Sequence, residues 1–160
     1  MKYIISILLF VLAMVQPTIA QDYEPVKYDI NSAGSGVQGT YLVKVFVYSK
    51  NAKVSDLSLK YAAVHGVLFR GFQGKPSAPP LAGSAAAEEQ KKDYFNAFFG
   101  KTNNDETGIF QNYAEIVEGS YQRVKTSKGY KVGAVVQVNK EKLRADLSTA
   151  GIIQGLSSGF

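Results

Sequence analysis

The sequence contains no cysteine and no tryptophan, and it has a single histidine, His65. The lack of cysteine excludes disulfides, thiolate zinc sites, iron–sulfur clusters and a cysteine nucleophile. One histidine also excludes most histidine-rich metal sites. Charged residues make up 19% and hydrophobic residues 46% of the 160 residues, a balance that is ordinary for a globular chain and argues against wholesale disorder. This length accommodates one domain.

A cleaved secretory signal is predicted over residues 1–20. Lys2 provides the positive start, residues 3–15 form an apolar run interrupted only by Ser6, and Pro17 ends that run. Thr18 and Ala20 are the residues at the −3 and −1 positions of a cleavage site. The apolar run is shorter than the ~20 residues that span a bilayer. We therefore expect cleavage after Ala20, export to the periplasm or out of the cell, and no transmembrane segment in the mature chain; the alternative is an uncleaved N-terminal anchor. A lipoprotein is excluded, since there is no cysteine to acylate.

After the signal, the hydrophobic pattern predicts an irregular leader over 21–39 and a single α+β domain over 40–160. The predicted elements are a strand at 40–48, a helix at 56–69, a proline-containing loop at 74–83, a helix at 85–99, hairpin strands at 113–125 and 130–139, and a last helix at 140–150. This order, β-α-α-β-β-α, predicts a two-layer sandwich. Three or four mostly antiparallel strands form its sheet, and about three helices pack largely on one face.

The segment 40–48 is the strongest strand signal. Val43, Val45 and Val47 share one face, and Leu42, Phe46 and Tyr48 share the other. Apolar residues on both faces predict a central strand that is at least partly covered on each side. The first hairpin strand alternates poorly, so the sequence leaves the hairpin register open.

Positive charge is concentrated toward the C-terminus. Residues 21–118 carry a net charge of −1, whereas residues 119–160 carry +5. A candidate anion site therefore lies on the predicted hairpin, at Arg123, Lys125, Lys128 and Lys131. The alternative is a solvated hairpin and helix that are lysine-rich without a partner. Nucleic acid is not an expected partner, because export removes the protein from the cytoplasm.

Clustered aromatic residues provide a second candidate surface. Phe98 and Phe99 close the second predicted helix, and Phe69 and Phe72 bracket Arg70. Aromatic side chains at helical spacing are typical of a core, whereas exposed aromatics beside an arginine are typical of a protein contact. These five residues are the candidate contacts with an unidentified envelope protein, and their exposure or burial discriminates between the two interpretations.

Three motif matches lack the structural context that their chemistry requires. The glycine-rich run 34–39 matches a dinucleotide fingerprint but precedes a strand instead of a helix. Residues 155–159 match a nucleophile elbow, but no histidine follows them. The calcium-loop spacing that begins at Asn103 puts Ala114 at the position that needs a bidentate glutamate.

The isolated titratable residues also make no chemical site. His65 is predicted on a helix surface or at the edge of the core, and Glu115 and Glu118 are predicted as surface charges. We therefore expect no catalytic residue, no metal ligand, no cofactor-binding residue and no cofactor. An enzyme with an unrecognised site of carboxylates, tyrosines and lysines is the remaining catalytic alternative.

The predicted strand at 130–138 and the following helix carry a resemblance. A strand that opens Tyr-x-Val, ends at a polar cap and leads into Lys-x-x-Leu-Arg-x-x-Leu resembles the closing segment of small exported Gram-negative envelope proteins. These proteins have a strand–helix–strand–strand core and include certain outer-membrane lipoproteins and flagellar T-ring accessory proteins. This chain differs by its missing lipidation cysteine and by the proline-rich loop and helix before the hairpin. The resemblance implies a non-enzymatic envelope role and transfers no functional residue.

Three functional hypotheses follow from the sequence. The first is a non-catalytic envelope or secreted protein that acts through protein contacts. The second is a binding module for a small molecule or an anionic polymer at the basic hairpin of residues 123–131. The third is the enzyme with an unrecognised site.

Overall fold

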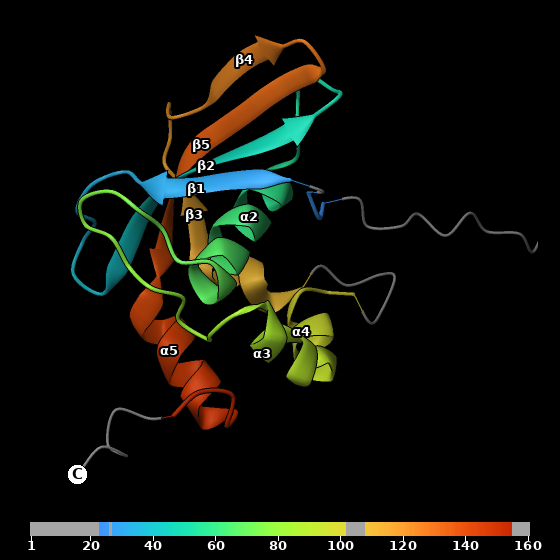
Figure 1. Cartoon of the computed structure of the whole chain (residues 1–160). Helices are drawn as coiled ribbons and strands as arrows, with labels where there is room; N and C mark the ends of the chain where they lie inside the picture. Colours follow the sequence, from blue (N-terminus) through green and yellow to red (C-terminus); the bar gives the residue numbers. More distant parts are fainter. Residues whose placement is uncertain (1–22, 26, 102–107, 155–160) are drawn as a thin grey trace, which may run out of the picture.

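The structure is a computed structural model that describes residues 23–25, 27–101 and 108–154 (Figure 1). The predicted signal at 1–20, the calcium-loop residues within 102–107 and the elbow motif at 155–159 lie outside the described residues.

One antiparallel sheet organises the described part of the chain. Its strands are β1 (Tyr28–Ser32), β2 (Thr40–Ser49), β3 (Ala114–Ile116), β4 (Gln122–Thr126) and β5 (Gly129–Asn139). β2 pairs with β1 on one side and with β5 on the other, and β3 and β4 follow each other along the second edge of β5. With the helices described next, the sheet confirms the predicted α+β class and the central place of the strand at 40–48.

The helices lie together on one side of this sheet. They are α2 (Asp56–Phe69), α3 (Ala85–Gln90), α4 (Lys92–Phe98) and α5 (Lys140–Thr149), and a short 3-10 helix η2 (Ile109–Tyr113) precedes β3. Figure 1 shows the helices below the sheet and the β4–β5 hairpin projecting away from them. Ser55 begins α2, because its side-chain oxygen accepts the N–H of Ser58 at 3.2 Å. Asn139 begins α5 in the same way, through the N–H of Lys142 at 3.0 Å.

The core lies between α2 and the sheet face turned toward it. The two central strands bury Val43, Val45 and Val47 of β2 and Val132, Ala134, Val136 and Val138 of β5 on this face. α2 approaches β1 closely at Gly66, where a Cβ would meet the side chain of Ile30. The glycine thus allows the helix to sit directly on the strand, and the rest of α2 is mostly buried.

β1 corrects the prediction of an irregular leader over 21–39. Tyr28 and Ile30 stand opposite Val47 and Val45 and so point toward the core. The three other residues of the strand, Asp29, Asn31 and Ser32, are polar, and the strand is at the edge of the sheet. A five-residue edge strand with only two inward apolar residues gives little periodic signal.

The helix predicted at 85–99 is interrupted. α3 and α4 are separate helices, and Lys91 between them has φ −113° and ψ 30°, outside the helical region. α3 has no buried residue, whereas α4 buries Phe95 and Phe98. Tertiary packing therefore holds only the second half of the predicted helix.

The strand predicted at 113–125 is also divided, because residues 117–121 form a bulge between β3 and β4. These five residues stand opposite only Ala134 and Val135 of β5. The Ser120 hydroxyl accepts the N–H of Val135 at 3.0 Å and donates to the carbonyl of Val117 at 2.6 Å. The bulge reverses the alternation between the two halves, which explains the weak pattern in the sequence.

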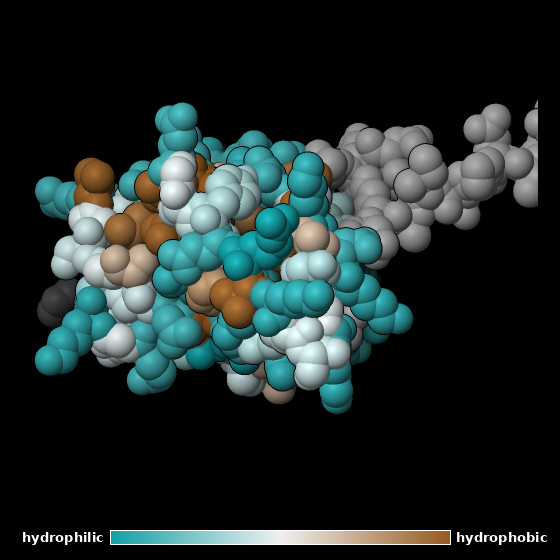
Figure 2. All heavy atoms as spheres, turned by 90° about the horizontal axis from the view of Figure 1, so that it is seen from above, coloured by the Kyte–Doolittle hydropathy of each residue, from teal (hydrophilic) through white to brown (hydrophobic). Residues whose placement is uncertain are grey.

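The second face of the sheet is open. Leu42, Phe46 and Tyr48 of β2 point to this face and are half-buried. No helix packs on it within the described ranges, and the cover expected over Phe46 and Tyr48 comes from lysines instead. Figure 2, seen from above, shows apolar atoms in separate spots between hydrophilic side chains.

Candidate functional site

The four candidate aromatic contacts are core residues. Phe69, Phe72, Phe98 and Phe99 are at most 5% exposed. The ring centroids of Phe99 and Tyr61 are 4.7 Å apart, and Phe98 and Phe99 meet edge to face at 5.0 Å. These positions therefore provide no exposed aromatic patch. Phe69, Phe98 and Phe99 stabilise the packing of α4 against α2, and the Phe72 ring meets Tyr41 of β2 edge to face.

Arg70, the fifth candidate partner contact, is exposed but has a structural role. Its guanidinium carbon lies 4.7 Å from the ring centroid of Tyr28, and its Nη1 donates to the Tyr28 carbonyl at 2.9 Å. Arg70 thus ties the end of α2 to β1.

Strand alternation divides the four candidate anion contacts between two faces. Arg123 stands opposite Val132, and Lys125 stands opposite Tyr130, so both lie on the helix side of the sheet. Lys131 stands opposite Tyr48 and lies on the open face. Lys128 is in the turn between β4 and β5. The hairpin therefore carries two separate basic groups, where the sequence predicted one.

On the open face, Lys44 of β2, Lys131 of β5 and Lys27, which directly precedes β1, gather over two aromatic rings. We call Lys27, Lys44, Phe46, Tyr48 and Lys131 the lysine–aromatic face. The Lys131 Nζ lies 4.8 Å from the Phe46 centroid and 5.3 Å from the Tyr48 centroid. The Nζ of Lys44 lies 5.3 Å from Phe46, and the Nζ of Lys27 lies 4.6 Å from Tyr48. Each exposed contact of this type contributes about 0.5–1 kcal/mol, so the rings hold the ammonium groups in place over the sheet.

Asp29 lies at the centre of this group. Its Oδ2 accepts the Tyr48 hydroxyl at 2.8 Å and lies 2.7 Å from the Lys131 Nζ. The hydrogen bond from Lys131 lowers the pKa of Asp29, and the same bond raises the pKa of Lys131. Glu115 is on the same face but stands opposite Gln137, six positions along β5 from Lys131. That is roughly 20 Å away at the rise of a strand, so three lysines face one nearby carboxylate.

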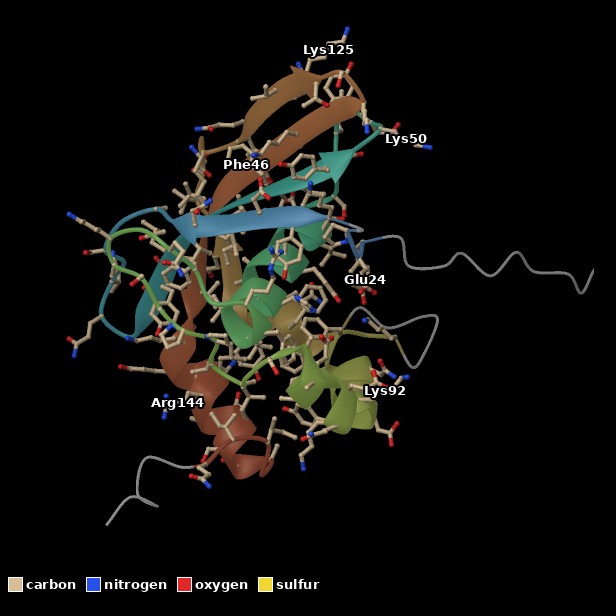
Figure 3. The ribbon with its side chains drawn as sticks, viewed as in Figure 1. Glu24, Phe46, Lys50, Lys92, Lys125 and Arg144 are labelled. Atoms are coloured by element: carbon tan, nitrogen blue, oxygen red, sulfur yellow. The ribbon has the colours of Figure 1, made fainter. Side chains whose placement is uncertain are left out.

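Further cations surround the hairpin end of the sheet. Lys50 follows β2, and Lys125 and Lys128 lie at the end of the hairpin. Figure 3 shows Phe46 between β2 and β5, and Lys50 and Lys125 extending outward from the same end. The lysine–aromatic face therefore continues into an exposed basic rim.

His65 forms the most connected polar cluster near the core. Its Nδ1 lies 2.6 Å from the Tyr28 hydroxyl, and its Nε2 lies 3.3 Å from the Glu88 carboxylate of α3. The ring stacks on Tyr61 at 5.3 Å, and Tyr61 donates to Glu24, which also pairs with Lys101. Burial lowers the pKa of His65, and Glu88 opposes that shift. Burial also raises the pKa of Tyr28 to about 12, so this hydroxyl stays protonated. In a neutral imidazole whose Nε2–H is directed at Glu88, Nδ1 is the nitrogen that accepts the Tyr28 hydroxyl.

This cluster predicts a pH dependence of stability. The unfolded chain has a histidine pKa of ~6.5, and the folded value is lower, so below that pH the unfolded state binds more protons. The free energy of unfolding should therefore fall as the pH decreases from 7 to 5, and His65→Gln should flatten this slope. Urea unfolding of both proteins at several pH values measures this slope. Asp29 does not interfere, because its pKa is lowered from 3.8 and it titrates below this window. Equal slopes for the two proteins would contradict the assignment.

The residues set aside in the sequence analysis form no site in the described parts of the chain. Glu115 and Glu118 are exposed, and the glycine-rich run 34–39 connects β1 to β2. Within 23–25, 27–101 and 108–154, no three histidine, aspartate or glutamate side chains come together as a metal-binding group.

The comparisons with known proteins give no relative. No protein-family model matches the chain, no curated protein matches it, and no solved structure matches it. Among the described residues, no helix is both long and apolar enough to cross a membrane. The resemblance to envelope proteins therefore stays a prediction.

Two lysines of the open face, Lys27 before β1 and Lys44 in β2, were not predicted from the sequence. Lys27 and Lys44 lie within residues 21–118, which carry a net negative charge, so the charge distribution along the sequence did not single them out. The sequence did contain an indication of this face, because Lys44, Phe46 and Tyr48 are at every second position of β2 and so share one face. Their meeting with Lys131 depends on the antiparallel register of β2 and β5, which no single segment specifies.

Proposed function

We propose that the protein is an exported, non-catalytic binding protein whose lysine–aromatic face binds an anionic polymer in the periplasm or outside the cell. The observation that carries the proposal is the array of Lys27, Lys44 and Lys131 held over Phe46 and Tyr48, on a face that no helix covers among the described residues. Export rests on the signal pattern in residues 1–20.

The shape of the face favours a polymer over a single small anion. Neighbouring strands lie about 4.8 Å apart, and Lys27 and Lys131 flank Tyr48 across the sheet, while Lys44 lies four positions along β2 from Tyr48. The ammonium groups are therefore spread over the face, and further cations follow at Lys50 and Lys128 at the hairpin end. A chain with repeated negative charges can contact several of these ammonium groups at once, and each contact is weak alone.

The protein-contact hypothesis has less support. It depended on exposed aromatic residues at 69–72 and 98–99, and those rings are buried. The polymer proposal uses ammonium groups at the surface: Lys44 pairs with no carboxylate among the described residues, and Lys131 pairs with Asp29 beside the two rings.

Binding of the wild-type protein to polygalacturonate, an acidic polysaccharide, tests the proposal. Electrostatic attachment should be strong in about 20 mM salt and weaken at least tenfold in about 500 mM salt, because the screening length falls from tens of ångströms to a few. Dextran, a neutral polysaccharide, serves as the control polymer and should not bind at either salt concentration. Equal binding of both polymers, or no binding of polygalacturonate at low salt, would refute the proposal.

A further inference from the structure

A separate pocket lies on the other face of the hairpin. It has a volume of about 460 Å³ and is formed by the connection from β2 to α2 on one side and by β4 and β5 on the other. Its lining residues are Ala52, Lys53, Val54, Tyr121, Gln122, Arg123 and Val132. The pocket exists because the hairpin projects past the start of α2, so residues 52–54 and not the helix face the sheet here. A volume of this size is typical of small-molecule sites.

The charged groups of the pocket are both positive. Lys53 and Arg123 line it, and neither forms an ion pair with another residue in the described parts of the chain. Asp56 follows the lining residues 52–54 in the sequence. Its carboxylate accepts a hydrogen bond from the Tyr121 hydroxyl at 2.6 Å. This bond joins α2 to the segment before β4 and braces one wall of the pocket.

The remaining lining is largely apolar. Ala52 and Val54 come from the connection, and Val132 forms the end of the buried face of β5. The pocket thus combines an apolar wall with cations at its side, the combination that suits an anionic head on an apolar body.

We infer that this pocket binds a small amphipathic organic acid, with its carboxylate held between Lys53 and Arg123 and its apolar part against Val54 and Val132. The planar guanidinium of Arg123 matches a carboxylate in a two-point hydrogen-bonded geometry. Lys53 adds a second, mobile positive charge. The site lies on the opposite face of the hairpin from the lysine–aromatic face, so it goes beyond the polymer proposal and does not depend on it.

Isothermal titration calorimetry of the purified protein with three probes tests the inference. Octanoate carries both a carboxylate and an apolar chain, acetate carries only the carboxylate, and octanol carries only the chain. Octanoate should bind at least tenfold more tightly than either of the others, because each of them satisfies only half of the pocket. Octanol binding as tightly as octanoate would overturn the inference, and so would acetate binding as tightly.

Two substitutions locate the site. Arg123→Ala and Lys53→Ala should each raise the dissociation constant of octanoate about fivefold or more, which corresponds to about 1 kcal/mol. Lys44→Ala, on the opposite face, is the matched control and should leave octanoate binding unchanged. Octanoate affinity that is insensitive to Arg123→Ala and Lys53→Ala would refute the site. The same two variants should bind polygalacturonate like the wild type, because the polymer contacts the other face. This measurement distinguishes the two proposals.

Discussion

Phe99→Ala is expected to lower the free energy of unfolding by about 3–5 kcal/mol, as for other fully buried aromatic rings. Phe99 is 0% exposed, and its ring centroid lies 4.7 Å from Tyr61, 5.0 Å from Phe98 and 5.6 Å from Phe110. Its backbone carbonyl also accepts the hydroxyl of Tyr23. Removing the ring leaves a cavity at the junction of α2, α4 and η2. Since a domain is stable by only about 5–15 kcal/mol in total, this loss is large.

Urea or thermal unfolding measures the effect, and Ile109→Ala is the matched control. Ile109 is 51% exposed on η2, next to the buried Phe110, so its truncation should change the free energy of unfolding by less than about 0.5 kcal/mol. A Phe99→Ala protein as stable as wild type would place that ring on the surface and restore the aromatic-contact hypothesis.

Lys44→Glu is expected to weaken polygalacturonate binding about tenfold at low salt, or about 1.4 kcal/mol. The substitution places a carboxylate beside Phe46 in the middle of the lysine–aromatic face. There its negative charge also offsets the positive charge of the nearby Lys131. Lys44 forms no ion pair with a described residue, so its loss should cost little stability. The difference from wild type should shrink in about 500 mM salt, because the charges are then screened.

Lys91→Glu is the control for this charge reversal. Lys91 is exposed between α3 and α4 on the helix side of the molecule, and its side chain also lacks an ion pair within the described ranges. Both variants change the net charge by the same amount, so a general charge effect would weaken binding equally. Equal loss in the two variants would contradict a localised face.

Local patterns predicted the elements whose signals are contained in one segment. The strand at 40–48 alternates between valines and larger residues, and it is β2 at the centre of the sheet. The helix at 56–69 has a serine cap and is rich in apolar residues, and α2 has those same bounds. Such elements carry their own periodicity and boundary residues, so no distant contact is needed to recognise them.

The elements that depend on distant partners were predicted less well. β1 is recognisable only through its pairing with β2, because just Tyr28 and Ile30 point inward. The bulge at 117–121 depends on the Ser120 hydroxyl replacing a backbone partner of Val135. The candidate site followed the same rule: the hairpin charges were visible in the sequence, but the register decides which face each one occupies.

The central claim is that an anionic polymer binds on the open face of the sheet, and NMR measures this directly. Backbone amide shifts of the isotope-labelled protein would be followed during addition of polygalacturonate at low salt. The account predicts the largest shifts at residues 44–48 of β2 and 131–135 of β5, with Tyr61 and Val64 in the core of α2 little changed. Shifts concentrated on α3 and α4 instead, with the strand residues unchanged, would contradict it.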